Sequence, residues 1–347
     1  MRKLRVAVLM GGLSSERAVS FSTGRMILES LDTEKYDAFP VDAALFSGSV
    51  QPRLPGSETE VAAVAEAERA LATTGPLRPV SDLGSTEDGR RVDVAFIALH
   101  GRFGEDGTIQ GMLELLGIPY TGSGVLASAL AMDKIVSKRV LRQAGVPMPD
   151  SVDIRRRSDL VTRDILAEVR ILGYPVMVKP SRQGSTIGMA KAESEGELMP
   201  AIEEAFKYDS QVLIEEFVPG TEITVGLLGN DEPMALPIVE IVPAKGFYDY
   251  EAKYTPGATD EIVPARIPQA AAARAQELAV TAHRALGCRG MSRVDMIVRS
   301  EQDVVVLEVN TIPGMTPTSL LPTAARAAGV SFPELLDRLI QLALEEE

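Results

Sequence analysis

Apolar residues alternate with polar ones, or run together over short stretches, at intervals along the whole chain, and these patterns predict β-strands. The stretches span residues 5–10, 92–99, 176–179, 211–218, 222–228, 293–298 and 304–309. Helical patterns lie between them, at residues 17–31, 60–71, 123–144 and 270–286. Because strands that alternate with helices are typical of α/β proteins, we expect an α/β fold.

Turn signals divide this pattern into units. The first predicted strand ends in Gly11 and Gly12 before the helix at residues 17–31, so the opening third is interpreted as a small doubly wound unit. The helix at residues 123–144 ends in a glycine and then a proline, a stop signal that leads into a second unit. Residues 43–91 carry no recognisable chemistry and are interpreted as a surface connection.

The last two predicted strands flank a short polar break and form a candidate hairpin. A register that places Arg299 opposite Val304 also places Asp295 opposite Glu308. Opposed carboxylates destabilise neighbouring strands unless a cation lies between them, and hard oxygen ligands suit Mg²⁺ that bridges phosphates. The alternative is a solvated, charged sheet face. Period-two alternation places four polar side chains on the shared face: Arg293, Asp295, Glu308 and Asn310.

Residues 179–188 have the composition of a phosphate-binding loop. Lys179 ends an apolar strand and is followed by small, hydroxyl-bearing and glycine residues, which let backbone amides converge on phosphate oxygens. The two common glycine fingerprints for nucleotides are absent, so a plain turn is the alternative. In the next predicted strand, the backbone of Glu216 to Val218 is a candidate for an adenine edge, and Glu222 beyond it for a ribose, with an ordinary edge strand as the favoured alternative.

Two further loops are candidates for substrate contact. His100 follows an apolar strand and lies at its carboxyl end, where α/β sheets present ligands. Residues 246–254 are rich in tyrosine, lack regular periodicity and have the character of a lid, although a surface bulge without a role is the alternative. His283 lies within a predicted helix and is interpreted as a surface or packing residue.

Composition excludes several classes of function. The 347 residues include 35 Lys and Arg against 49 Asp and Glu, and the net charge of -14 argues against nucleic-acid or anionic-membrane partners. No apolar run is long enough for a signal peptide or a membrane span, so we expect a soluble protein. Cys288 is the only cysteine, which excludes a disulfide framework and favours the cytoplasm.

Taken together, these segments resemble the ATP-grasp superfamily and, within it, the D-alanine:D-alanine ligases, over essentially the whole chain. The motifs that carry the resemblance lie at residues 11–20, 100–107, 132–134, 179–188, 248–254, 293–295 and 308–315, and include Met-Asp-Lys at 132–134 and Arg-Val-Asp at 293–295. The chain departs from the family before residue 91 and in the side chains at residues 215–217. The resemblance implies an N-terminal doubly wound domain, a central ATP-grasp domain and a C-terminal ATP-grasp domain, at residues 1–121, 122–214 and 215–347, with a lid at 246–263.

The resemblance also implies roles for single residues. The implied catalytic residues are Glu16, Ser185, Tyr254, Arg293 and Gly314. The implied substrate-binding residues are His100, Lys253, Ser319 and Leu320. The implied ATP-binding residues are Lys134, Lys179, Glu215, Glu216, Phe217, Val218 and Glu222. The implied metal ligands are Asp295, Glu308 and Asn310.

The implied reaction joins two D-alanines through an acyl phosphate, for peptidoglycan precursor synthesis. The implied cofactors are ATP as co-substrate and two Mg²⁺ ions, with Mn²⁺ as a substitute and a monovalent cation as a further candidate. The implied partners are small molecules and a second copy of the chain in a homodimer, with no nucleic acid and no membrane.

Three alternatives stay open. The first is a related enzyme, either a D-alanine:D-lactate ligase or another ATP-grasp carboxylate–amine ligase. Tyr254 disfavours the D-lactate version, because lactate-using relatives lack a tyrosine in this lid position. A dinucleotide-binding oxidoreductase is suggested by Gly11 and Gly12 after a strand, but the third glycine and the following acidic residue are missing. A non-catalytic nucleotide sensor would be expected to have lost a metal ligand or a lysine, and none is lost.

Overall fold

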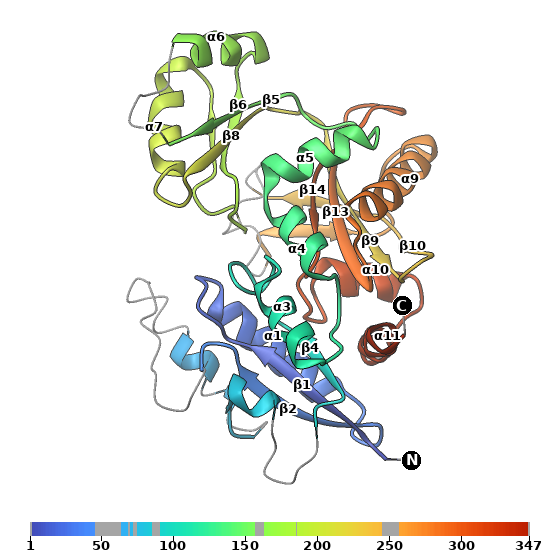
Figure 1. Cartoon of the computed structure of the whole chain (residues 1–347). Helices are drawn as coiled ribbons and strands as arrows, with labels where there is room; N and C mark the ends of the chain where they lie inside the picture. Colours follow the sequence, from blue (N-terminus) through green and yellow to red (C-terminus); the bar gives the residue numbers. More distant parts are fainter. Residues whose placement is uncertain are drawn as a thin grey trace.

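The computed structural model describes residues 2–45, 64–68, 70–71, 75–84, 91–156, 163–184, 186–244 and 257–345. These parts form an α/β architecture of three sheets, stacked along the long axis of the molecule (Figure 1). Ser185, Lys253, Tyr254 and most of the predicted lid lie outside the described residues. Of the predicted helix at residues 60–71, residues 64–68 and 70–71 are described and are helical, with a 3-10 conformation at Leu71.

The first sheet is parallel and doubly wound, as the sequence predicted. Its strands lie in the order β3 (Arg78–Pro79), β2 (Tyr36–Asp42), β1 (Leu4–Met10) and β4 (Val94–Ile97). A short 3-10 helix, η2 (Val80–Leu83), follows β3. Alternate residues of β1 enter different cores: Val6 and Val8 pack with α1 (Arg17–Ser30) and α11 (Phe332–Leu344), whereas Ala7 and Leu9 pack with α3 (Thr108–Leu116).

The second sheet is antiparallel and carries the predicted phosphate loop. Its strands lie in the order β5 (Ser151–Arg155), β8 (Gln211–Glu216), β6 (Val176–Pro180) and β7 (Ala190–Ala192). Residues of α6 (Arg163–Leu172) and α7 (Glu195–Ala205) fill the core on one face. The predicted boundary between residues 214 and 215 falls inside β8, and the domain limits stay a prediction.

The third sheet carries the predicted hairpin. Its strands lie in the order β12 (Thr259–Ile262), β11 (Val239–Pro243), β9 (Thr221–Leu228), β13 (Met291–Val298) and β14 (Val304–Asn310), and β10 (Met234–Ala235) pairs with β9. One face packs on α4 (Val125–Met132), α5 (Lys134–Gln143) and α9 (Gln269–Leu286). On the other face, Leu320 and Leu321 of α10 (Leu320–Ala327) join a core that continues into the first sheet.

The predicted single helix at residues 123–144 is wrong, because the chain breaks at Asp133 between α4 and α5. Asp133 leaves the helical conformation, and its carboxylate accepts hydrogen bonds from the N–H groups of Ile135 and Val136, both at 3.1 Å. A side chain that satisfies the first N–H groups of a helix favours a new helix start over continuation.

The hairpin register is confirmed at the polar face and wrong at the turn. Asp295 lies opposite Glu308 and Arg293 opposite Asn310, but Val298 lies opposite Val304, where the sequence predicted Arg299. Met296 pairs with Val306, so Leu307 is the extra residue of a β-bulge. The physical reason is burial, since Val304 and Val306 pack in the core beneath α9 and fix the register near the turn.

In the parts of the chain that the structure describes, no helix is long and apolar enough to span a membrane. Cys288 is buried in the core beneath α9.

Candidate active site

A pocket lies between the second and third sheets, and all seven residues predicted to bind ATP line it. These residues are Lys134, Lys179, Glu215, Glu216, Phe217, Val218 and Glu222. Its wall also contains apolar side chains, such as Met177 and Ile187, and two predicted metal ligands, Asp295 and Glu308. An apolar slot that ends in lysines and carboxylates has the character of a site for a flat ring carrying phosphates.

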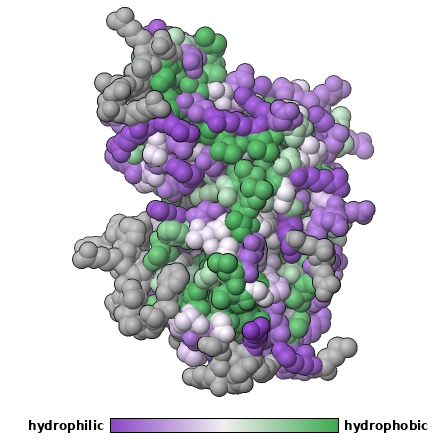
Figure 2. Space-filling view, viewed as in Figure 1, coloured by the Kyte–Doolittle hydropathy of each residue, from purple (hydrophilic) through white to green (hydrophobic). Residues whose placement is uncertain are grey.

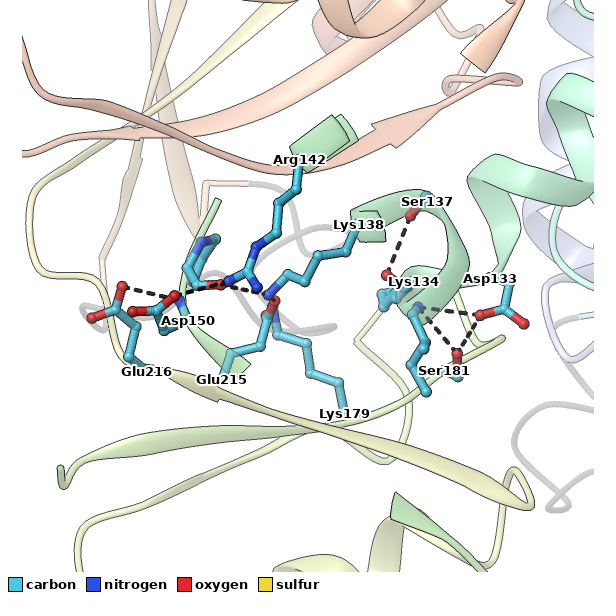
Figure 3. A network of polar contacts seen from close by, with 12 residues as sticks. Asp133, Lys134, Ser137, Lys138, Arg142, Asp150, Lys179, Ser181, Glu215 and Glu216 are labelled. Carbon is cyan, nitrogen blue, oxygen red and sulfur yellow. Dashed lines mark hydrogen bonds and ion pairs between the residues drawn. The ribbon is translucent and has the colours of Figure 1, made fainter. Parts of the chain in front are cut away.

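The two predicted lysines reach this pocket from different elements (Figure 3). The Lys179 ammonium on β6 lies 2.6 Å from a Glu215 oxygen. Burial would lower the pKa of Lys179, but the carboxylates of Glu215, and then of Glu308 and Glu222, outweigh burial and raise it. Lys134, the first residue of α5, donates to the Gln183 carbonyl at 2.8 Å and lies 3.3 Å from Glu308.

Sequence reasoning missed Lys138, whose buried side chain also binds Glu215. The Lys138 ammonium donates a second hydrogen bond to the Pro149 carbonyl at 2.8 Å. Burial lowers the pKa of Lys138 despite the attraction of Glu215. Spacing could have found this residue, because Lys134 and Lys138 are four positions apart on a helix and therefore share a face.

In the segment predicted to bind adenine, part of the backbone already forms hydrogen bonds within the protein. The N–H groups of Glu216 and Phe217 donate to the carbonyls of Asp150 at 2.9 Å and Pro175 at 3.1 Å. The Glu216 carboxylate accepts from Arg299 at 3.0 Å, across the gap between two sheets. Neither of these two N–H groups is therefore offered to a nucleotide in this structure.

Asp295 is the centre of a polar cluster on β13. Its carboxylate forms two 2.9 Å contacts with Arg293 and accepts from Thr224 at 2.6 Å and from Asn310 at 3.1 Å. Thr224, on β9, is a second residue that sequence reasoning missed. Its position opposite Asp295 in the β9–β13 pairing is the signal that a three-strand register would have supplied.

The predicted metal ligands offer two carboxylates and one amide oxygen on one sheet face. Among the described residues, no group of three or more His, Cys, Asp or Glu side chains could hold a metal ion by itself. This donor set fits Mg²⁺, which is bound through one or two carboxylates together with substrate phosphates in place of a full protein cage.

A second pocket brings together segments from both ends of the chain. Of the predicted catalytic and substrate residues, it is lined by Glu16, His100, Arg293, Gly314, Ser319 and Leu320. Glu308 lines both this pocket and the nucleotide pocket. A group bound in one pocket therefore meets a group bound in the other at the β13–β14 polar face.

His100 carries two acidic neighbours at the wall of the second pocket. Its ring lies 3.7 Å from Glu105 and contacts the Thr23 hydroxyl at 3.2 Å. Burial would lower the pKa of His100, but Glu105 and then Glu16 raise it, while burial raises the pKa of Glu105. Glu105, Thr23 and Glu261 line this pocket without having been predicted. Glu105 lies within the motif at 100–107, which could have identified it.

The start of α10 closes the other side of the second pocket. Ser319 occupies the N-cap position of this helix but makes no side-chain capping hydrogen bond, and its hydroxyl accepts instead from the Thr316 N–H at 3.1 Å. A Cβ atom added at Gly314 would lie 3.0 Å from that hydroxyl, so a larger residue at this position would require the Ser319 side chain to shift.

Comparisons with known proteins agree with this arrangement. Family models described as "D-ala D-ala ligase N-terminus" and "D-ala D-ala ligase C-terminus" match residues 5–123 and 140–341. A D-alanine–D-alanine ligase of Pelotomaculum thermopropionicum is 46% identical over 99% of this chain and 97% of its own length.

Solved structures show the same similarity. The D-alanine–D-alanine ligase of Bacillus anthracis, in complex with ATP, matches with a TM-score of 0.75 at 34% identity, over 98% of this chain and 97% of its own. The VanG D-Ala:D-Ser ligase of Enterococcus faecalis matches with a TM-score of 0.81 at 36% identity, over 99% of this chain and 100% of its own.

Proposed function

Because this chain belongs to the D-alanine–D-alanine ligase family, with the ATP-grasp fold, we infer that it joins two D-alanines into D-alanyl-D-alanine and cleaves ATP to ADP and phosphate. The observation that carries the inference is Glu308, which lies opposite Asp295 and lines both pockets. The dipeptide is a precursor for peptidoglycan. The use of ATP and a lone buried cysteine support a cytoplasmic location.

The first step overcomes the poor reactivity of a carboxylate. Transfer of the γ-phosphoryl group of ATP to the first D-alanine makes an acyl phosphate and releases ADP. Lys134 and Lys179 line the nucleotide pocket and supply positive charge near the phosphates. Glu16, buried in the wall of the second pocket, is proposed to hold the ammonium group of this D-alanine.

Asp295, Glu308 and Asn310 are proposed to hold Mg²⁺, for which Mn²⁺ is a substitute. When bound, the metal neutralises negative charge on the phosphate oxygens during transfer. In this structure, Arg293 and Thr224 hold Asp295 in place, so the carboxylate is oriented before a substrate arrives.

In the second step, the amine of the second D-alanine attacks the acyl phosphate, and phosphate leaves. Negative charge develops on the carbonyl oxygen, and Arg293 together with the Gly314 amide is proposed to stabilise it. One such donor is commonly worth about 3 kcal/mol of barrier. The N–H groups at the start of α10, next to Ser319 and Leu320, are proposed to bind the carboxylate of the second D-alanine. The catalytic roles of Ser185 and Tyr254 and the substrate-binding role of Lys253 stay predictions.

A homodimer is proposed from the exposed apolar side chains on two adjacent helices. Leu115 and Leu116 of α3 and Leu126 of α4 are 91%, 42% and 71% exposed. Figure 2 shows hydrophobic atoms gathered in the middle of one face, over the region of α3 and α4. Such a patch is typical of a protein–protein interface, and light scattering of Leu115→Glu against the unchanged protein tests it.

The test of the function is phosphate release from ATP with one amino acid or hydroxy acid at a time. We expect release with D-alanine and Mg²⁺, and a dipeptide product by mass spectrometry. L-alanine should give little, because the second pocket presents a fixed array of charges that only one stereoisomer matches.

Assays with D-serine or D-lactate, each mixed with D-alanine, distinguish ligases that differ in their second substrate. A mixed D-alanyl-D-serine or D-alanyl-D-lactate product in excess over D-alanyl-D-alanine would reassign the second substrate. Equal release with L-alanine and D-alanine, or none with D-alanine at millimolar concentration, would remove the assignment.

A further inference from the structure

We propose that Lys138 is a positioning residue of the nucleotide pocket, which neutralises Glu215 and thereby leaves the positive charge of Lys179 to the phosphate groups. The inference rests on the proposed use of ATP. The proposal assigns a role to the buried Lys138 ammonium, which takes no part in the reaction steps above.

Glu215 is shared between two lysines from different elements (Figure 3). One of its oxygens forms an ion pair with Lys138 of α5, and the other lies 2.6 Å from the Lys179 ammonium of β6. Glu215 is 2% exposed and Lys138 is 3% exposed. With both oxygens in charge-assisted contacts, the orientation of this carboxylate is fixed.

Only part of this cluster faces the nucleotide pocket. Glu215 and Lys179 line the pocket, whereas Lys138 does not. The Pro149 carbonyl accepts a further hydrogen bond from the Lys138 ammonium at 2.8 Å, which holds the ammonium beside Glu215. Lys138 therefore acts on a bound nucleotide through Glu215 and not by contact.

The charges explain why two lysines are present. Lys179 and Glu215 alone would form a neutral buried pair, and in a poorly screened interior the carboxylate would cancel most of the attraction of Lys179 for a phosphate. With Lys138 added, the cluster carries a net charge of +1. Lys138 does not line the pocket, whereas Lys179 does. A bound phosphate group therefore meets the net positive charge of the cluster at Lys179.

A purely structural role is the competing explanation, since Lys138 also ties α5 to the chain at Pro149. Arg142 lies one turn further along α5 and donates to the same Pro149 carbonyl at 2.7 Å, and to Asp150 at 3.0 Å. It forms no contact with Glu215 among the described interactions. Arg142 is therefore a matched control for the link to Pro149.

The experiment measures binding of ADP and of adenosine by calorimetry or competition, with Mg²⁺ and without D-alanine. Lys138→Met is expected to raise the Kd for ADP about tenfold, the loss typical of one charge-assisted contact. Its Kd for adenosine should change less than about twofold, because adenosine carries no phosphate charge for Lys179 to attract. Lys138→Arg keeps the charge and should restore most of the ADP affinity. Arg142→Met should bind both ligands as the unchanged protein does.

Steady-state rates give an independent readout. In Lys138→Met, the KM for ATP should rise while the KM for D-alanine stays unchanged, since Lys138 has no contact with the second pocket. If Lys138→Met does not fold, the comparison of Glu215→Gln with Glu215→Gln/Lys138→Met replaces it. Loss of Lys138 should then have little further effect on ADP binding, because no carboxylate remains to be neutralised.

Several results would overturn the proposal. They are equal loss of ADP and adenosine binding in Lys138→Met, the same loss in Arg142→Met, and a full additional loss in the double variant. Failure of the unchanged protein to bind any nucleotide would contradict the proposed function as well. Normal nucleotide binding without dipeptide formation would contradict the proposed function alone.

Discussion

At the scale of single residues, Glu308 combines opposing electrostatic contacts. It faces the like charge of Asp295 across the hairpin, and the Lys134 ammonium lies 3.3 Å away. Since opposed carboxylates repel, the pair needs positive charge, which Arg293 supplies to Asp295 and Lys134 to Glu308 in this structure, and which the proposed Mg²⁺ would add to when bound. The charge of Glu308, more than its shape, should therefore matter to activity.

Glu308→Gln tests this statement, because it keeps the shape and removes the charge. We expect turnover to fall on the order of 100-fold or more, while thermal unfolding stays near that of the unchanged protein. The assay is phosphate release over a range of Mg²⁺ concentrations. Near-normal turnover at every Mg²⁺ concentration would mean that the carboxylate pair is only a charged surface. Glu301→Gln, in the exposed turn of the same hairpin, is the matched control.

His283 is a packing residue, one of the two interpretations that its sequence allowed. It is fully buried on α9, its ring contacts the Ser292 hydroxyl at 2.7 Å, and burial lowers its pKa to about 4. Between pH 6.5 and about 4, the unfolded chain takes up a proton that the folded protein does not. The free energy of unfolding should therefore decrease by up to about 3 kcal/mol as the pH falls through this window.

Urea unfolding of the unchanged protein and of His283→Asn, at pH 7 and pH 4.5, measures that contribution. The variant should lose less stability between the two pH values than the unchanged protein. An identical loss in both would assign the acid sensitivity to other groups.

At the scale of elements, side-chain chemistry decides where helices and strands change course. Asp133 ends one helix and starts the next, and its carboxylate also accepts from the Ser181 hydroxyl of the phosphate loop at 2.8 Å. The break between α4 and α5 therefore brings Lys134, the first residue of the new helix, to the nucleotide pocket.

Asp133→Ala should lower the free energy of unfolding by about 1 kcal/mol, the usual cost of losing a helix cap. The KM for ATP should also rise, because the helix start that fixes the position of Lys134 would be lost. Asp133→Asn keeps an oxygen for the N–H groups and should recover most of the stability. Denaturant unfolding and steady-state kinetics check both effects, and a fully stable alanine variant would contradict the capping role.

Period-two alternation was sufficient to predict the polar face of the hairpin, since Asp295 and Glu308 do lie opposite each other. It could not predict the bulge at Leu307, because the burial of Val304 and Val306 depends on α9, which is distant in sequence. The helix break at Asp133 was missed for a similar reason: its carboxylate is held by Ser181, 48 residues further along the chain. Lys138 shares a helix face with Lys134, but its partner Glu215 is known only from the fold.

At the scale of the whole molecule, α11 covers part of one face of the first sheet. Side chains of α11, including Leu335 and Leu336, share one core with Val6 and Val8 of β1. Asp337 adds polar contacts to Lys35 at 2.9 Å and to the Tyr36 hydroxyl at 2.7 Å. Segments near the two ends of the chain therefore share one core. Glu16 and Ser319, which line the second pocket, are attached to elements of this core.

Leu336→Ala should cost about 2–5 kcal/mol of unfolding free energy, because it leaves a cavity in this shared core. Arg338→Ala, on the exposed side of the same helix, removes a surface contact to Glu334 and should change stability by less than about 0.5 kcal/mol. Calorimetry and proteolysis of the N-terminal sheet are the measurements. If the N-terminal sheet keeps its protection in Leu336→Ala, the shared core is not a cooperative unit.

The shared core also has a consequence for protein synthesis. The strands of the first sheet are translated long before α11, the helix that covers part of one face and follows β4 by more than 200 residues. At about 5–20 residues per second, this apolar face waits on the order of tens of seconds for α11. During that interval the part of the sheet face that α11 covers is exposed to other chains and to chaperones, so the folding yield in the cell should depend on how the ribosome-bound N-terminal segment is protected.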